Sequence, residues 1–85
     1  MRRLVNRPVA VEWLSRPRDR RFFPMRIYWD GAWHDVPELF LGFHHTYGER
    51  DALRHVWEVC TDGHWFRLVL DPRSLIWTLE IVADD

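Results

Sequence analysis

Two Asp-Gly dipeptides, each set between runs of apolar and aromatic residues, constrain the fold of this chain more than any other feature. They are Asp30-Gly31 and Asp62-Gly63. A two-residue type I′ turn needs positive φ at both central positions, which Asp and Gly accept, and its twist matches that of paired strands. The sequence therefore predicts two tight β-hairpins.

The charges around Asp62-Gly63 set the register of that hairpin. With a two-residue turn, Glu58 lies opposite Arg67 and Arg54 lies opposite Asp71. Opposite charges paired across two strands each contribute about 0.2–1 kcal/mol. The alternate positions form an apolar face made of His55, Trp57, Val59, Phe66, Leu68 and Leu70. A slip of one residue would destroy both patterns, so the register is well specified.

The hairpin at Asp30-Gly31 is predicted in the same way. Arg26 lies opposite Asp35, and Tyr28 lies opposite Trp33. The other face, which we expect to be buried, collects Met25, Ile27, Trp29, Ala32, His34 and Val36. Tyr28 and Trp33 would also suit a core, so the opposite assignment of the two faces stays open.

Strand signals on either side complete the fold prediction. Residues 9–14 alternate as a strand does, and Asp71-Pro72-Arg73-Ser74 favours a type I turn. After that turn, one face of a last strand is predicted to hold Leu75, Trp77, Leu79 and Ile81. Residues 38–43 fit either a bent strand or a short helical turn, and residues 44–52 are predicted to form a loop. We expect an all-β fold of five or six antiparallel strands in consecutive hairpins, forming a small barrel or a strongly bent sheet.

Size and composition agree with one domain spanning residues 1–85, with residues 1–8 as a flexible arm. Six Trp, five Phe and two Tyr are many for 85 residues. Each can bury about 150–250 Å², which compensates for a small core. Cys60 is the only cysteine, so there is no internal disulfide. No apolar stretch approaches the roughly 20 residues of a membrane span, and we expect a cytoplasmic protein.

The net charge of −1 conceals an asymmetry along the chain. Residues 1–27 carry eight arginines against two acids, a net +6, whereas residues 28–85 carry four arginines against eleven acids, a net −7. All twelve basic residues are arginine. Exclusive use of arginine fits either a GC-rich genome or selection for bidentate contacts with phosphate and carboxylate.

No pattern in the sequence indicates catalysis, a metal site or a cofactor. Five histidines are present, but the adjacent His44 and His45 would point to opposite faces of a strand, and the others are dispersed. Structural zinc sites usually take four closely spaced Cys or His ligands. A nucleophile such as Cys60 would need a base beside it, and the sequence places none there. We therefore predict no catalytic residue, no metal ligand and no cofactor.

A nucleic-acid surface is one prediction that the charges and aromatics allow. Small β-barrels stack bases on exposed aromatic rings beside basic grooves. The outer faces of the two predicted hairpins offer such a set: Arg26, Tyr28, Trp33, Trp65 and Arg67. The alternative is that these rings cover a second core layer and that the arginines pair with the acidic remainder of the chain.

A protein interface is the other prediction. Trp, Tyr and Arg dominate interface hot spots, and the basic and acidic parts of the chain could meet between two copies. Residues 39–47 are rich in apolar residues, and their candidate contact positions are Leu39, Phe40, Leu41, Phe43 and Tyr47. If this tract is exposed, it is a contact site for a protein partner or for a second copy.

Residues 22–83 resemble a family of short bacterial β-domains of unknown function, some of which occur near genes for DNA-damage tolerance, including translesion-polymerase accessory factors. The matching features are Ile27-x-Trp29-x-Gly31 followed by Trp33 and Val36, Arg50, Trp57-Glu58-Val59, Asp62-Gly63, Phe66-Arg67-Leu68, and Trp77-x-Leu79. Asp30 before Gly31 and the additional histidines depart from the family pattern. The resemblance implies a DNA-repair setting by association and assigns no catalytic residue.

The sequence thus predicts a non-enzymatic adaptor that binds a protein partner or itself, in a DNA-metabolism setting. Direct binding of single-stranded nucleic acid through arginines and exposed aromatics is the first alternative. A small metal-dependent enzyme is the second, and it would require several of the histidines and Cys60 to converge.

Overall fold

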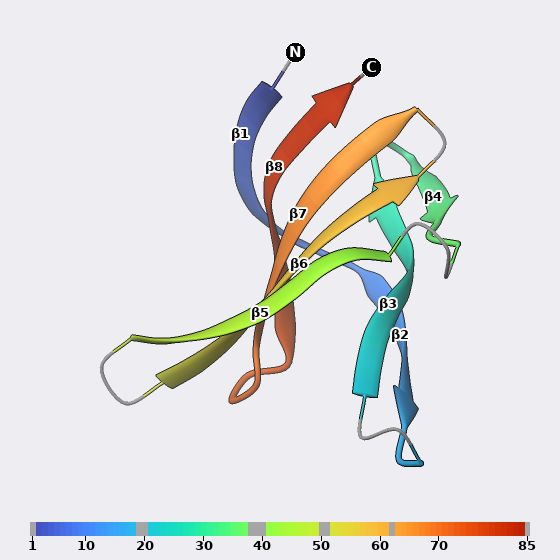
Figure 1. Ribbon diagram of the computed structural model, residues 1–85. Helices are drawn as coiled ribbons and strands as arrows, with labels where there is room; N and C mark the ends of the chain where they lie inside the picture. The colour runs from blue at the N-terminus through green and yellow to red at the C-terminus, as the bar shows by residue number, and fades with distance from the viewer. Residues whose placement is uncertain (1, 19–20, 38–40, 50–51, 62, 85) are drawn as a thin grey trace.

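The computed structural model describes residues 2–18, 21–37, 41–49, 52–61 and 63–84. These residues form eight strands, all paired antiparallel, and no helix (Figure 1). The strands are β1 (Arg2–Val9), β2 (Val11–Arg16), β3 (Arg21–Trp29), β4 (Ala32–Asp35), β5 (Leu41–Glu49), β6 (Ala52–Thr61), β7 (His64–Asp71) and β8 (Ile76–Asp84). The predicted all-β antiparallel class is confirmed.

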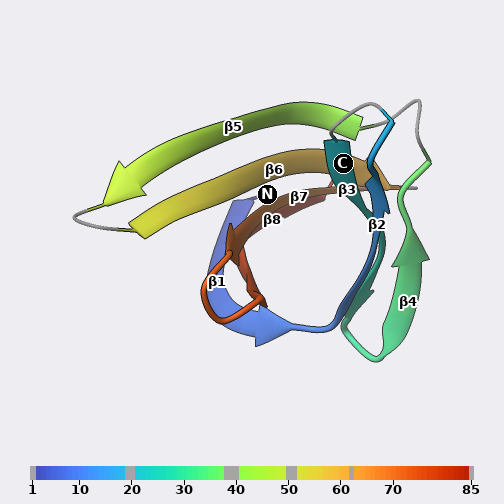
Figure 2. The same cartoon turned by 90° about the horizontal axis from the view of Figure 1, so that it is seen from below.

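The strands form two sheets that share one bent segment of chain. The larger sheet has the order β1-β8-β7-β6-β5, and the smaller sheet has the order β2-β3-β4. β1 pairs with β8 and β2 pairs with β3, so the chain changes sheets at Ala10, whose carbonyl accepts a hydrogen bond from the Tyr28 N–H at 2.9 Å. Figure 2 shows this segment curving from one sheet into the other. Among the described strands, no ladder joins β4 to β5, so a closed barrel is not found there.

Both Asp-Gly hairpins have the predicted registers. Glu58 pairs with Arg67 in the β6–β7 hairpin, and Tyr28 pairs with Trp33 in the β3–β4 hairpin. The φ angles of Asp30 and Gly31 are +53° and +79°, as a type I′ turn requires. Gly63 has a φ of +80°, whereas Asp62 lies outside the described residues.

Two segments are strands where the sequence predicted none. Of residues 1–8, predicted as a flexible arm, residues 2–8 belong to β1, which pairs with β8. The loop predicted at residues 44–52 is wrong, because residues 41–49 and 52–61 form the β5–β6 pair. Of the ambiguous tract 38–43, residues 38–40 lie outside the described part of the chain and residues 41–43 are strand. β1 pairs with a strand at the other end of the chain, and β5 pairs with β6 across Arg50-Asp51, which carries no Asp-Gly turn signal.

Bulges change the predicted faces at two places. The β2–β3 register shifts between Glu12 and Trp13, and Met25, predicted to be buried, is 42% exposed. The β7–β8 register shifts between Arg67 and Leu68, so that Val82 rather than Ile81 is buried. An extra residue in one strand reverses the alternation beyond it. Leu75, predicted to face the core, lies in the β7–β8 turn with a φ of +60°.

One core lies between the two sheets. Its fully buried side chains include Ile27 from the smaller sheet and Val59, Phe66, Leu68, Leu79 and Val82 from the larger sheet. The Phe22 ring of β3 meets the Trp57 and Trp77 rings edge-on, with centroids 6.0 and 6.5 Å apart. These contacts between aromatic rings hold the two sheets together.

Candidate functional site

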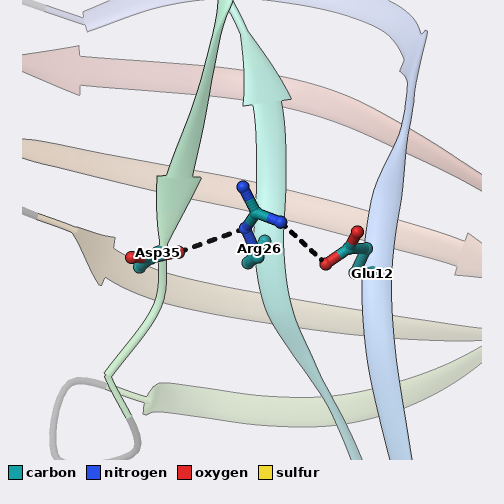
Figure 3. Close-up of polar contacts among 3 residues, drawn as sticks. All are labelled: Glu12, Arg26 and Asp35. Carbon is teal, nitrogen blue, oxygen red and sulfur yellow. Dashed lines mark hydrogen bonds and ion pairs between the residues drawn. The ribbon is translucent and has the colours of Figure 1, made fainter.

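A cross-strand row of alternating charges lies on the outer face of the smaller sheet, the face turned away from the core. Arg26 on β3 lies between Glu12 on β2 and Asp35 on β4 (Figure 3). Its Nη1 is 3.2 Å from Glu12 Oε2, and its Nε is 3.2 Å from Asp35 Oδ1. The strand registers put the three residues side by side, so the guanidinium charge is compensated from both neighbouring strands.

An exposed aromatic pair adjoins this row. The Tyr28 and Trp33 rings meet edge-on with centroids 5.4 Å apart, and they are 44% and 39% exposed. The Arg26 Cζ lies 4.7 Å from the centroid of the Trp33 ring, within the range of a cation–π contact. Both rings therefore stay on the surface, as the face assignment with Ile27 inside predicted.

An apolar groove that the sequence analysis missed continues the same outer face. It has a volume of about 400 Å³, and its lining comprises Leu14, Arg16, Phe23, Met25, Arg26, Asp35, Val36 and Pro37. Phe23 and Val36 are buried, and the Arg16 Cζ lies 4.9 Å from the Phe23 ring centroid. The bulge that exposes Met25 brings it to this groove, and a bulge leaves no clear signal in the sequence.

The other two predicted binding residues, Trp65 and Arg67, lie on the outer face of the larger sheet. They alternate along β7 with the buried Phe66 and Leu68. Arg67 is again flanked by acids, with Nη1 at 3.9 Å from Glu58 Oε1 and Nε at 3.1 Å from Glu80 Oε1. The structure therefore divides the predicted surface between two sheets and does not bring its five residues together.

A separate basic and aromatic contact lies at the N-terminal end of β1. The Arg2 Cζ is 5.5 Å from the Trp65 ring centroid, and the Arg3 Cζ is 5.7 Å from that of Trp29. Neither Arg2 nor Arg3 makes an ion pair with another described residue. Trp65 therefore has an arginine neighbour that the sequence analysis did not assign to it.

The predicted interface tract contributes the strand at one edge of the larger sheet. Leu41, Phe43 and Tyr47 belong to β5, where the structure describes the backbone and not these side chains. Leu39 and Phe40 lie outside the described residues. β5 pairs with β6 on one side, and no described strand pairs with its other side.

Two of the histidines meet where β4 approaches β7. The His34 and His64 rings are 5.2 Å apart at their centroids, and His64 Nε2 is 3.3 Å from Asp84 Oδ1. His34 Nε2 donates to the Trp29 carbonyl at 3.0 Å, which occupies that nitrogen. In the described part of the chain, no group of three or more His, Cys, Asp or Glu residues is placed to hold a metal ion.

Burial and hydrogen bonding shift the pKa of two groups. His55 packs edge-on against Phe22 at 4.9 Å, and burial lowers the pKa of its imidazole from 6.5. In the β7–β8 turn, the Arg73 N–H donates to Asp71 Oδ1 at 2.9 Å and is the main reason why the pKa of Asp71 lies below 3.8. Arg54 lowers it further, with Nη1 at 2.8 Å from Asp71 Oδ1.

Comparisons with family models, with curated proteins and with solved structures give no match for this chain. No helix among the described residues is long and apolar enough to cross a membrane. The resemblance to short bacterial β-domains stays a prediction from the sequence, and function has to be argued from the surfaces themselves.

Proposed function

We propose that this chain is a non-enzymatic protein-interaction or oligomerising module. The observation that carries the proposal is the outer face of the smaller sheet, where Leu14, Met25, Tyr28 and Trp33 are all exposed. Large apolar side chains gathered exposed on one face of a small domain, here on both sides of the charged row of Glu12, Arg26 and Asp35, are typical of interaction sites. Tyr28 and Trp33 belong to residue types that are typical of interface hot spots. Arg26, which stacks on Trp33 in the same face, is of a third such type.

The ion pairs of Arg26 and Arg67 favour a protein partner over nucleic acid at these positions. Each guanidinium lies between two carboxylates. A phosphate that approached either arginine would have to displace a carboxylate or accept its repulsion. Phosphate contacts supply most of the affinity of nucleic-acid binders, so compensated arginines contribute little to it.

Single-stranded nucleic acid is the second candidate ligand, and the Arg2–Trp65 contact favours it. Arg2 is exposed, and Trp65 offers a ring on which a base could stack next to a cation. This site lies on β1 and β7, away from the apolar face of the smaller sheet. The resemblance to the short bacterial β-domains adds a DNA-metabolism setting to both candidates, and the single cysteine fits a cytoplasmic location for either.

Binding to labelled single- and double-stranded oligonucleotides across a salt series, together with sedimentation analysis, tests the proposal. We expect no salt-sensitive binding, and a mass that rises above that of the monomer with concentration. Micromolar binding that weakens steeply with salt and is lost in Trp65→Ala, but kept in Trp33→Ala, would overturn the proposal in favour of nucleic acid.

A further inference from the structure

β5 is a long strand with an open edge. It spans Leu41–Glu49, pairs along its length with β6, and ends the order of the larger sheet. Figure 2 shows it at the outer margin of the molecule. An edge strand presents a row of backbone N–H and C=O groups that can pair with another chain.

β5 carries few of the features that usually protect such an edge, and Glu49 is its only Asp, Glu, Lys or Arg residue. The strand contains no proline, lysine or arginine. Its one register shift lies between Leu41 and Phe43, so pairing with β6 is regular from Phe43 to Glu49. Natural sheets block open edges with those residues or with bulges, so this edge is suited to pair with another strand.

The order of residues along β5 is close to symmetric about His45. If two copies of β5 run antiparallel with His45 opposite its counterpart, Gly42 falls opposite Gly48 and Phe43 falls opposite Tyr47. Aromatic residues in cross-strand pairs stabilise a sheet. Glu49 of each copy falls opposite Leu41 of the other, so the two carboxylates lie at opposite ends of the pair.

We propose that β5 pairs antiparallel with β5 of a second copy of this chain, joining two five-stranded sheets into one continuous sheet. A two-fold axis through His45 makes the contact isologous, the commonest arrangement in soluble dimers. The near-symmetric residue order favours a second copy over an unrelated peptide strand. This inference rests on the proposed oligomerising function. It identifies the partner as a second copy of the chain and the contact as the open edge of β5.

Backbone geometry indicates which residue to change. The Glu49–Ala52 pair flanks a two-residue connection and is expected to be a hydrogen-bonded pair, as in tight hairpins. Hydrogen-bonded pairs alternate with non-hydrogen-bonded pairs along antiparallel strands. Counting back from Glu49, the N–H of Tyr47 is therefore expected to point to β6 and the N–H of Thr46 to the open edge. Thr46→Pro therefore removes a donor from the open edge, and Tyr47→Pro removes one from the β5–β6 ladder.

Sedimentation equilibrium on the unmodified chain and on Thr46→Pro tests the inference. We expect a monomer–dimer equilibrium whose dissociation constant rises at least about tenfold in Thr46→Pro, since the symmetric pair loses a hydrogen bond at two places. Thr46→Ala keeps the backbone N–H at the same exposed position, so it is the matched control and should dimerise as the unmodified chain does. Met25→Glu alters the apolar face of the smaller sheet and shows separately whether that face takes part in association.

Amide hydrogen exchange on the unmodified chain gives a readout that needs no variant. The N–H groups of His44, Thr46 and Gly48 should gain protection as protein concentration rises. A chain that stays monomeric at millimolar concentration would overturn the inference. Association that survives in Thr46→Pro and is lost in Met25→Glu would also overturn it, but would leave the proposed function standing with its interface on the smaller sheet.

Discussion

Gly63 has a backbone conformation that L-residues with a side chain rarely adopt. Its φ is +80°, and a Cβ added there would meet nothing within 4 Å. Gly63→Val therefore introduces conformational strain without a clash. We expect it to reduce the free energy of unfolding by about 1–2 kcal/mol, the cost of the left-handed region for an L-residue, as measured by urea denaturation.

Gly63→Asn is the matched control for this prediction. Asparagine tolerates positive φ better than β-branched residues do, so its loss should be clearly smaller. Equal stability of Gly63→Val and the unmodified chain would show that the turn does not depend on positive φ at this position.

Trp57 is one of the tryptophans of the core, and only 2% of its surface is exposed. Trp57→Ala is expected to cost about 3–5 kcal/mol, because it removes buried apolar surface and leaves a cavity. Trp33→Ala, which truncates a ring that is 39% exposed, should cost clearly less. Urea denaturation of the two variants compares them directly, and similar losses would contradict the assignment of Trp57 to the core.

At the scale of elements, the β7–β8 turn is expected to make stability depend on acid pH. The pKa of Asp71 lies below 3.8 in the folded chain, chiefly because the Arg73 N–H donates to its carboxylate. The unfolded chain therefore binds more protons in this range. The stabilisation is fully present above the unfolded pKa and is lost as pH falls through the folded pKa.

Asp71→Asn separates the contribution of the carboxylate charge from that of the hydrogen bond in the turn. The amide oxygen can still accept from the Arg73 N–H, but the ion pair with Arg54 is lost. We expect the variant to have a lower unfolding midpoint than the unmodified chain at pH 7, with the difference shrinking below the unfolded pKa and vanishing once the pH lies below the folded pKa of Asp71. Urea titrations at a series of pH values measure this, and a constant difference at every pH would contradict it.

Hairpins with a clear turn signal could be predicted from the sequence, whereas the β5–β6 hairpin, which lacks an Asp-Gly turn, and the distant β1–β8 pair could not. The β3–β4 and β6–β7 hairpins were predicted with correct registers, because a two-residue turn and facing charges specify them within a short segment. β1 lacks a period-two pattern, and its partner β8 lies at the other end of the chain. The bulges near Met25 and Glu80 add one residue each and leave no clear sequence signal.

The residues of a candidate surface could likewise be predicted together only where one hairpin presents them all. Arg26, Tyr28 and Trp33 were predicted together and are found together, because one hairpin presents all three. Trp65 and Arg67 belong to another hairpin, and the relative placement of two sheets is not encoded in either of them. The contact between Arg2 and Trp65 joins β1 to β7, which are far apart in the sequence, so only the folded structure could show it.

At the scale of the whole molecule, the two sheets are expected to unfold as one unit. They share the segment that bends at Ala10, and the Phe22 ring of the smaller sheet packs against Trp57 and Trp77 of the larger one. Neither sheet would keep a covered apolar face without the other. Tryptophan fluorescence and far-ultraviolet circular dichroism should therefore report the same urea midpoint, the test of two-state behaviour.

Phe22→Ala sharpens this prediction, because it removes the ring that contacts both tryptophans and leaves the ladders of both sheets in place. If the sheets form one cooperative unit, the variant lowers the midpoint of both probes equally, with a loss smaller than the roughly 3–5 kcal/mol of a fully buried ring, because Phe22 is only partly buried. If the smaller sheet unfolds separately, the two midpoints diverge in the variant. Separate midpoints would also mean that the smaller sheet, with its apolar face, can unfold while β5 stays folded in the larger sheet. The two proposed interaction surfaces would then differ in stability.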